Sequence, residues 1–208
     1  MRDDRFLIAD DGWCAAAQQV PSPNCDERPA GAAIDLLLIH NISLPPGEFG
    51  GSQIAELFTN TLDCDAHPYF DRLRSLRVSA HFFIRRDGQL LQFVSTNQRA
   101  WHAGVSQFGG RERCNDFSIG IEIEGTDFEP FNDRQYQVLT ALTQALQQRY
   151  PLAAVAGHQH VAPVRKTDPG PFFDWNRYRA LLAVSGQVAL SFPADGGMAD
   201  ATVVRTPA

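Results

Sequence analysis

The sequence lacks long apolar runs, paired cysteines and an excess of basic residues. No stretch of the 208 residues approaches the roughly 20 consecutive apolar residues that a membrane-spanning helix needs. The four cysteines are scattered without a Cys-x-x-Cys pair, so we expect free thiols in a reducing compartment. Eighteen Lys and Arg face 24 Asp and Glu, a net charge of -6, which argues against a nucleic-acid binder.

Several targeting and catalytic motifs are also missing. Residues 1–5 carry acids and the apolar run 6–9 is short, so we expect no signal peptide, no membrane partner and a cytoplasmic location. No Gly-x-Ser-x-Gly elbow marks a serine hydrolase, and no Gly-x-Gly-x-x-Gly or phosphate loop marks a nucleotide site. A Ser or Cys hydrolase stays open as one hypothesis for the function, and it predicts activity that survives complete metal removal.

The patterns that are present predict one α/β domain. Strands and helices alternate irregularly, and Asp87-Gly88 marks a hairpin, which together favour a mixed sheet. The predicted strands are 35–40, 77–84, 90–94, 117–125 and 152–156, and the predicted helices are 12–20, 53–62, 133–149 and 174–184. We expect an N-terminal segment 1–30 packed on the domain, the domain itself over 31–185, and a mobile tail over 186–208.

Some local details follow from residue types. Ser52 is placed to cap the helix over 53–62, and Asn132 with Gln135 predicts a capping box before 133–149. The stretch 109–113, which begins with Gly109-Gly110, is predicted as a loop. Isoleucines alternate along 117–125, which is typical of a half-buried strand.

Two histidine-bearing places suggest a metal. His40 ends a continuous apolar strand, where polar groups reach the rim of a sheet. Residues 157–171 gather two histidines, Asp168 and two cations beside a Pro-Gly turn that could fold back on itself. Two histidines and one carboxylate suit a catalytic zinc site. Whether His158 pairs with Asp168, or with His160 on one face of an extended segment, stays open at this point.

A zinc hydrolase also needs a base and an oxyanion stabiliser. Glu122 is the candidate base, because an apolar setting raises the pKa of a carboxylate. Lys166 is the candidate group for the developing negative charge. The residues alone leave even odds that either side chain is simply solvated.

Six segments, in the same order, resemble the zinc-dependent N-acetylmuramoyl-L-alanine amidases. The resemblance covers roughly residues 10–185 and is strongest to the cytoplasmic amidases of cell-wall recycling. The segments are Leu-Ile-His-Asn at 38–41, Pro-Pro-Gly-Glu-Phe-Gly-Gly at 45–51, Val-Ser-Ala-His at 78–81, Arg-Ala-Trp-His-Ala-Gly at 99–104, Ser-Ile-Gly-Ile-Glu at 118–122, and the stretch 157–171 with Lys-Thr-Asp-Pro-Gly-Pro at its end.

The resemblance implies a fold, a site and a reaction. The fold is a central mixed sheet flanked by helices, as in phage T7-type lysozyme and the peptidoglycan recognition proteins. One zinc ion is held by His40, His158 and Asp168, with Glu122 activating water and Lys166 holding transition-state charge. The implied substrate contacts are Asn41, Tyr69, Arg77, Ala100, Trp101 and Arg113. The remaining histidines, His67, His81, His102 and His160, are then structural or neighbours of the site.

The implied reaction is hydrolysis of the amide between N-acetylmuramic acid, preferentially in the 1,6-anhydro form, and L-alanine of the stem peptide. The expected partner is a small muropeptide and the expected state is a monomer. A non-catalytic peptidoglycan-binding module is the alternative, since the same fold supports one when metal ligands are lost. The complete residue set in this chain favours the enzyme.

Overall fold

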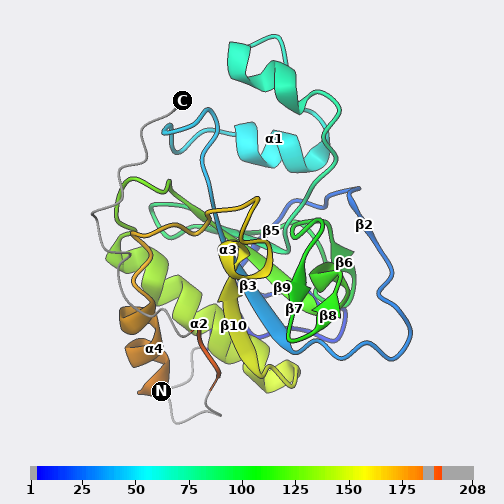
Figure 1. The fold of residues 1–208 in the computed structure, drawn as a ribbon, viewed down its shortest axis with the longest axis vertical. Coiled ribbons are helices and arrows are strands. Elements are labelled where there is room, and N and C mark those ends of the chain that lie inside the picture. The colour runs from blue at the N-terminus through cyan, green and yellow to red at the C-terminus, as the bar shows by residue number, and fades with distance from the viewer. Residues whose placement is uncertain (1–3, 185–189, 194–208) are drawn as a thin grey trace.

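A six-stranded mixed sheet forms the centre of the computed structural model, which describes residues 4–184 and 190–193 (Figure 1). The strand order is β1-β5-β4-β9-β3-β10, and only β4 and β5 pair antiparallel within it. The strands are β1 Gln18–Gln19, β3 Leu36–Ile42, β4 Phe82–Ile84, β5 Leu90–Gln92, β9 Ser118–Glu124 and β10 Ala154–Gly157. The predicted α/β class with a mixed sheet is confirmed.

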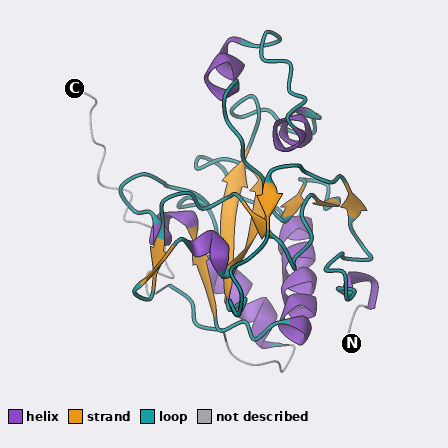
Figure 2. Cartoon of the chain, turned by 90° about the vertical axis from the view of Figure 1, so that its right-hand side faces the viewer, coloured by secondary structure: helices purple, strands orange, loops and turns teal. Residues whose placement is uncertain are grey.

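Helices flank the sheet, and α2 and α4 pack together over one of its faces (Figures 1 and 2). The α-helices are α1 Gln53–Thr59, α2 Asp133–Arg149, α3 His158–Val161 and α4 Trp175–Ala183, and the 3-10 helices are η1 Asp4–Phe6, η2 Pro68–Leu73 and η3 Cys114–Asp116. Two small ribbons pair β2 Cys25–Asp26 with β6 Arg99–Ala100 and β7 Gln107–Phe108 with β8 Arg111–Glu112. No helix of the described segments is both long and apolar enough to cross a bilayer.

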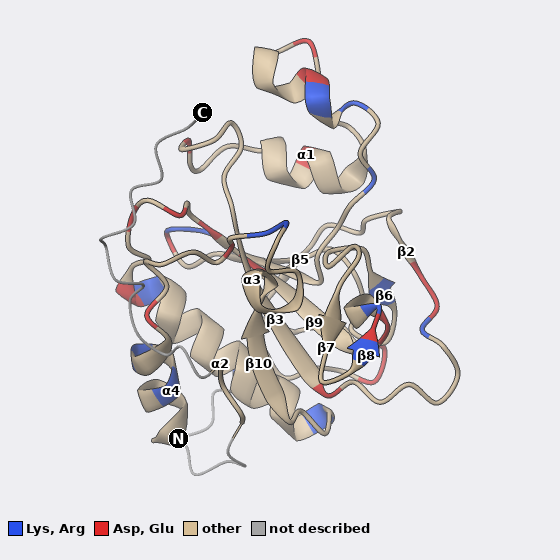
Figure 3. Cartoon of the chain, viewed as in Figure 1, with Lys and Arg blue, Asp and Glu red and all other residues tan. Residues whose placement is uncertain are grey.

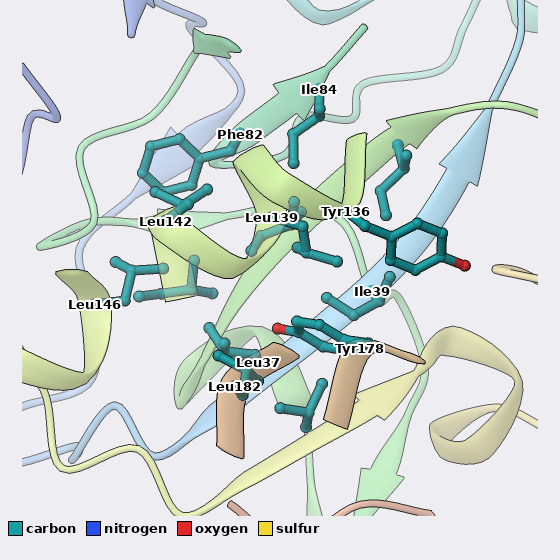
Figure 4. Close-up of a cluster of buried hydrophobic side chains, with 14 of the residues drawn as sticks. Leu37, Ile39, Phe82, Ile84, Tyr136, Leu139, Leu142, Leu146, Tyr178 and Leu182 are labelled. Atoms are coloured by element: carbon teal, nitrogen blue, oxygen red, sulfur yellow. The ribbon is translucent and has the colours of Figure 1, made fainter. Parts of the chain in front are cut away.

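The main core lies between the sheet and α2 with α4 (Figure 4). The amphipathic pattern of α2 buries Tyr136, Leu139, Leu142 and Leu146 against strand residues such as Ile39. The predicted capping box is confirmed, because the side chains and backbone N–H groups of Asn132 and Gln135 bond reciprocally at 3.1 Å. This rigid layer fixes the strands whose other face carries the polar site.

That other face is also buried, which corrects the prediction of a half-buried strand over 117–125. The isoleucines of β9 do alternate toward α2 as expected. The opposite side, with Ser118, Gly120, Glu122 and Glu124, is buried as well: the His102 ring lies against Gly120, and the backbone at Gly50 and Arg86 bonds Glu124. A strand in the middle of a parallel sheet is covered on both faces, so alternation alone could not reveal the second layer.

Four further local predictions were wrong. Residues 12–20 form no helix; instead the Cys14 backbone N–H bonds the side chain of Gln92, and β1 pairs with β5. The predicted strand 77–84 is a strand only at Phe82–Ile84. Ser52 precedes α1, but its hydroxyl bonds the Glu56 side chain and caps no backbone N–H. The predicted loop over 109–113 is a loop only at the turn of the β7–β8 hairpin, since Arg111–Glu112 forms β8. In these places a distant partner overrides the local preference.

The chain ends contact the domain where they are described. Phe6, Ile8 and Cys14 belong to the main core. Ser191 exchanges backbone hydrogen bonds with Ala153 and Val155 beside β10, inside the segment predicted as a tail. Leu190 and Phe192 pack against the main core, and residues 186–189 and 194–208 of that predicted tail lie outside the described residues.

Candidate metal centre

Three side chains distant in sequence converge at the end of β3. The Nδ1 atom of His40 lies 3.0 Å from Nδ1 of His158 and 2.9 Å from Oδ2 of Asp168. The distance from His158 Nδ1 to the same oxygen is 3.1 Å. β3 and β10 are adjacent parallel strands, and Ile39 pairs with Gly157. His40 therefore lies beside His158, the first residue after β10. The sheet order therefore builds the predicted ligand set, although it does not by itself show a metal.

Asp168 reaches this point because its loop folds back onto the end of β10. The Gln159 N–H donates to the Asp168 carbonyl at 2.9 Å. Gly157 permits the approach, since a Cβ there would lie 2.5 Å from Cδ of Pro169. Gly170 has a φ of +80° and lies so close to Asp127 that a side chain would collide with it. The Pro-Gly turn thus has the role that the sequence suggested.

The hydrogen bonds of His40, His158 and Asp168 are compatible with a cation bound between the three side chains. The Nε2 atom of His158 lies 3.1 Å from the Ala103 carbonyl, which can only accept, so this nitrogen carries the ring proton. In the neutral ring, Nδ1 then offers a lone pair toward the carboxylate of Asp168. Three atoms that can each offer a lone pair lie 2.9–3.1 Å apart, an arrangement that suits a cation between them. Their spacing is close to the edge of about 3.3 Å expected for a tetrahedron with zinc–nitrogen distances of about 2.0 Å.

The protonation preferences support the same conclusion. Burial, followed by the nearby charge of His158, lowers the pKa of His40 to about 4, although Asp168 opposes this shift. Burial alone would raise the pKa of Asp168, but hydrogen bonds with His158 and His40 outweigh it and hold the pKa low. A neutral imidazole and an ionised carboxylate are the forms that bind metals.

His160 is not part of this cluster, so the alternative pair of His158 and His160 is wrong. The two residues lie in α3, a single helical turn, and not in an extended segment. Two positions along a helix point in different directions. The Nδ1 atom of His160 accepts the Gly157 N–H at 2.8 Å, and its ring packs on Trp175.

Glu122 lies directly beside His40 in the β3–β9 register. Its carboxyl is buried, and within the described part of the chain its Oε2 atom has no hydrogen-bond partner. Burial, reinforced by the negative charge of Asp168, raises the pKa of Glu122 well above its ordinary value. An unpartnered buried carboxyl with a raised pKa suits a group that takes and returns protons.

A groove of about 730 Å³ opens over the cluster. Of the predicted functional residues, it is lined by Asn41, Tyr69, Lys166 and Asp168. The basic pair Arg165-Lys166 lies in the loop that follows α3 (Figure 3). The Asn41 side-chain amide donates to Asp127 at 2.7 Å, so one wall of the groove is oriented by a hydrogen bond. The space suits a small extended molecule with its reacting centre near Asp168.

The other four predicted substrate contacts are not among the residues that line this groove. Arg77 is exposed and donates to the Leu76 carbonyl at 2.8 Å. Ala100 is fully buried, and Trp101 beside it is half-buried. Arg113 has a left-handed backbone with φ of 60°, and its guanidinium pairs with Asp116 at 3.3 Å. The structure therefore brings the three predicted metal ligands together, and two of the six predicted contacts line the groove beside Asp168.

Three further residues contact the site: sequence reasoning gave no role to Asp127 and Arg165, and it placed His102 among the structural or neighbouring histidines. Asp127 holds Asn41, and His102 contacts His40 at 3.0 Å. Arg165 bonds the carbonyls of Ala103 and Val105. Their only signal in the sequence is proximity to motif residues, because these contacts arise in the folded chain.

Comparison with known proteins agrees with this geometry. The family model described as N-acetylmuramoyl-L-alanine amidase matches residues 30–171. The chain is 59% identical over 181 residues to the 1,6-anhydro-N-acetylmuramyl-L-alanine amidase AmpD of Citrobacter freundii, covering 86% of this chain and 97% of that protein.

Solved structures show the same fold. A crystal structure of a Se-Met AmpD derivative matches with a TM-score of 0.82 and 60% identity, covering 85% of this chain and 99% of that one. A complex of the amidase AmiD from E. coli with anhydro-N-acetylmuramic acid-L-Ala-D-gamma-Glu-L-Lys matches with a TM-score of 0.53 and 29% identity, covering 76% of this chain and 65% of that one.

Proposed function

The chain belongs to the N-acetylmuramoyl-L-alanine amidase family, and from this premise we propose that it is a zinc enzyme of cell-wall recycling. It is an amidase that hydrolyses the bond between N-acetylmuramic acid and L-alanine of the stem peptide. High identity to AmpD supports the 1,6-anhydro-muropeptides as substrates, and the AmiD complex supports a small muropeptide as the ligand.

The convergence of three donor atoms within 3.1 Å carries the metal part of the proposal. His40, His158 and Asp168 would hold the ion, and their chemistry suits zinc. Zinc bound there would acidify a water molecule and polarise the scissile carbonyl. The remaining steps fall to side chains of the chain itself.

Glu122 is proposed as the general base and then the general acid. Its carboxylate takes a proton from water as the water oxygen bonds the carbonyl carbon. The carbonyl oxygen gains negative charge, which the ammonium of Lys166 stabilises from the groove wall. The carbon–nitrogen bond then breaks, and Glu122 returns the proton to the leaving amine of L-alanine. Its raised pKa supports this double use.

We also propose which residues contact the substrate. Asn41 and Tyr69 line the groove, which supports their assignment. Arg77 and Arg113 would pair with carboxylates of the stem peptide, and the indole of Trp101 would pack on a sugar ring. Arg77, Ala100, Trp101 and Arg113 are not among the residues that line the groove, and we propose that a bound substrate reaches them from it.

The test is turnover of a purified anhydro-muropeptide by zinc-loaded protein, with and without a chelator. We expect release of the intact peptide, loss of activity on chelation, and recovery when zinc returns. Activity that persists without metal would indicate a Ser or Cys hydrolase instead. Binding without release by zinc-loaded protein would indicate a non-catalytic module.

We also propose a cytoplasmic monomer. Cell fractionation and light scattering of the full chain would check these two properties. Finding the protein in an exported fraction, or as a stable dimer, would contradict them.

A further inference from the structure

One short segment contacts the outer nitrogens of both metal-binding histidines. The Nε2 atom of His40 lies 3.0 Å from Nδ1 of His102. The Nε2 atom of His158 lies 3.1 Å from the carbonyl oxygen of the next residue, Ala103. All four residues are buried, so these contacts are shielded from competing water. Residues 102–103 therefore contact the Nε2 atoms of both proposed ligand histidines, one in β3 and one directly after β10.

The proton positions on the two ligand rings follow from these contacts. Since the Ala103 carbonyl only accepts, His158 carries its proton on Nε2 and presents Nδ1 to the metal. His40 presents Nδ1 only if its Nε2 also carries the proton, and that proton then points at Nδ1 of His102. His102 must accept there, which places its own proton on Nε2, 3.4 Å from the hydroxyl of Ser118. The hydroxyl can accept, so the assignment is consistent along the chain.

The sequence of β9 makes room for the His102 ring. Gly120 pairs with Leu38 in the sheet, one step away on the same face from the pair of Glu122 and His40. A Cβ at position 120 would lie 2.5 Å from both Cγ and Nδ1 of His102. The imidazole thus occupies the space of a missing side chain, and this holds its accepting nitrogen against His40.

We propose that His102 is a positioning residue for the metal, which fixes the tautomer and orientation of His40 while the Ala103 carbonyl does the same for His158. This inference rests on the proposed zinc site. Hydrogen-bond partners of this kind raise the basicity of a ligand histidine and hold its ring, and losing one typically weakens metal binding about 10–100-fold.

The test measures zinc affinity by competition with a chromophoric chelator, with the absorption spectrum of bound Co²⁺ as a second readout. The variant His102→Phe keeps a ring but removes the acceptor, and we expect about 10–100-fold weaker zinc binding and an altered Co²⁺ spectrum. The variant His102→Asn places an oxygen near the position of Nδ1, and we expect it to recover most of the lost affinity.

His81 offers a matched control. It is a buried histidine that contacts the His102 ring but bonds backbone groups rather than a metal ligand. We expect His81→Gln to lower stability while leaving zinc affinity within about threefold, which is well short of the effect of losing a ligand's partner. Equal weakening in His81→Gln and His102→Phe would reduce the role of His102 to packing and overturn the proposal.

Gly120→Ala provides an independent test if the phenylalanine variant does not fold. Its methyl group must displace the His102 ring, because the three atoms nearest to that position all belong to this ring. Wild-type zinc affinity in Gly120→Ala, or in a folded His102→Phe, would refute the proposal. Failure of the wild-type protein to bind zinc would instead refute the proposed metal site, so the two failures are distinguishable.

Discussion

At the scale of single residues, Glu122 is defined by what surrounds it. It shares the buried face of β9 with Glu124, yet the two carboxyls differ. Both oxygens of Glu124 accept backbone N–H groups, from Gly50 at 2.6 Å and Arg86 at 2.8 Å, so it ties two loops together. Glu122 keeps an oxygen without a partner in the described structure and faces the ligand cluster. The same residue type is structural at position 124 and is the proposed base at position 122.

We predict that Glu122→Ala and Glu122→Gln keep zinc and lose about 10²–10⁴-fold in kcat, because general-base catalysis contributes that much. Metal analysis and steady-state kinetics on folded protein would check this. Glu124→Gln serves as the comparison, and it should mainly lower the melting temperature. Near-normal turnover in either Glu122 variant would remove this residue from the mechanism.

His81 gives a prediction about pH and stability. Its Nδ1 accepts the Gly120 N–H and its Nε2 donates to the Gln98 carbonyl, both at 3.0 Å. Burial, helped by the positive charge of Arg28, lowers its pKa from 6.5 to about 3. Between these values the unfolded chain binds the proton and the folded chain does not. The contribution of His81 to the free energy of unfolding should therefore be fully present above pH 6.5, and it should be lost as the pH falls toward 3.

In His81→Gln, the free energy of unfolding should depend less steeply on pH. The difference in slope should be up to one proton, which corresponds to about 1.4 kcal/mol per pH unit. Urea unfolding of metal-free protein between pH 4.5 and 7 would measure it. His40 shifts in the same direction, so some slope will remain in the variant. An unchanged slope would mean that His81 is not held neutral in the fold.

At the scale of elements, Arg165 joins two loops of the site. Its guanidinium donates to the Ala103 and Val105 carbonyls at 2.9 and 2.8 Å. Gly104, with φ of 58°, keeps this contact open, because a Cβ there would approach the guanidinium to 3.2 Å. Arg165 is adjacent to Lys166 in the same loop as Asp168, so we infer that it positions both the proposed charge stabiliser and the proposed metal ligand.

We predict that Arg165→Met lowers kcat by about 10–100-fold, since misplacing a reacting group by about 1 Å can cost 10²-fold. Weaker zinc binding should accompany the loss. Arg177→Met is the matched control, because it removes an arginine that pairs with Asp133 on the surface between α4 and α2. Kinetics and zinc titration of both variants would test this, and equal behaviour would refute a positioning role for Arg165.

Predictability from sequence also varies by element. β3, β9 and α2 carry long, regular apolar patterns, and all three were predicted close to their bounds. The four-residue helix α3 is too short to show a period, and its presence decides which histidines share a face. Spacing therefore left His160 open as a ligand, and family resemblance was needed to prefer Asp168. The contacts of His102 and Arg165 depend on tertiary structure and have no local pattern.

At the scale of the whole molecule, the metal centre closes a long-range contact. One proposed ligand, His40, lies within β3 near its C-terminal end, and the other two follow β10 at residues 158 and 168. In the unfolded chain these donors are far apart on average, so zinc should bind the folded state much more tightly. Any ligand with this preference stabilises the fold by mass action. Bound zinc should therefore cross-link the C-terminal part of β3 to the segment that follows β10.

We predict that zinc at 100 times its Kd stabilises the protein by about 2.7 kcal/mol, which for this chain length raises Tm by about 5–10 °C. A chelator should reverse the shift. Asp168→Ala leaves two protein ligands, so it should fold but show little shift and little zinc by elemental analysis. Magnesium, which prefers oxygen ligands, is the control and should have no comparable effect. A full zinc-dependent shift in Asp168→Ala would mean that the stabilising zinc is bound elsewhere, and the ligand assignment would fall even if the amidase activity remained.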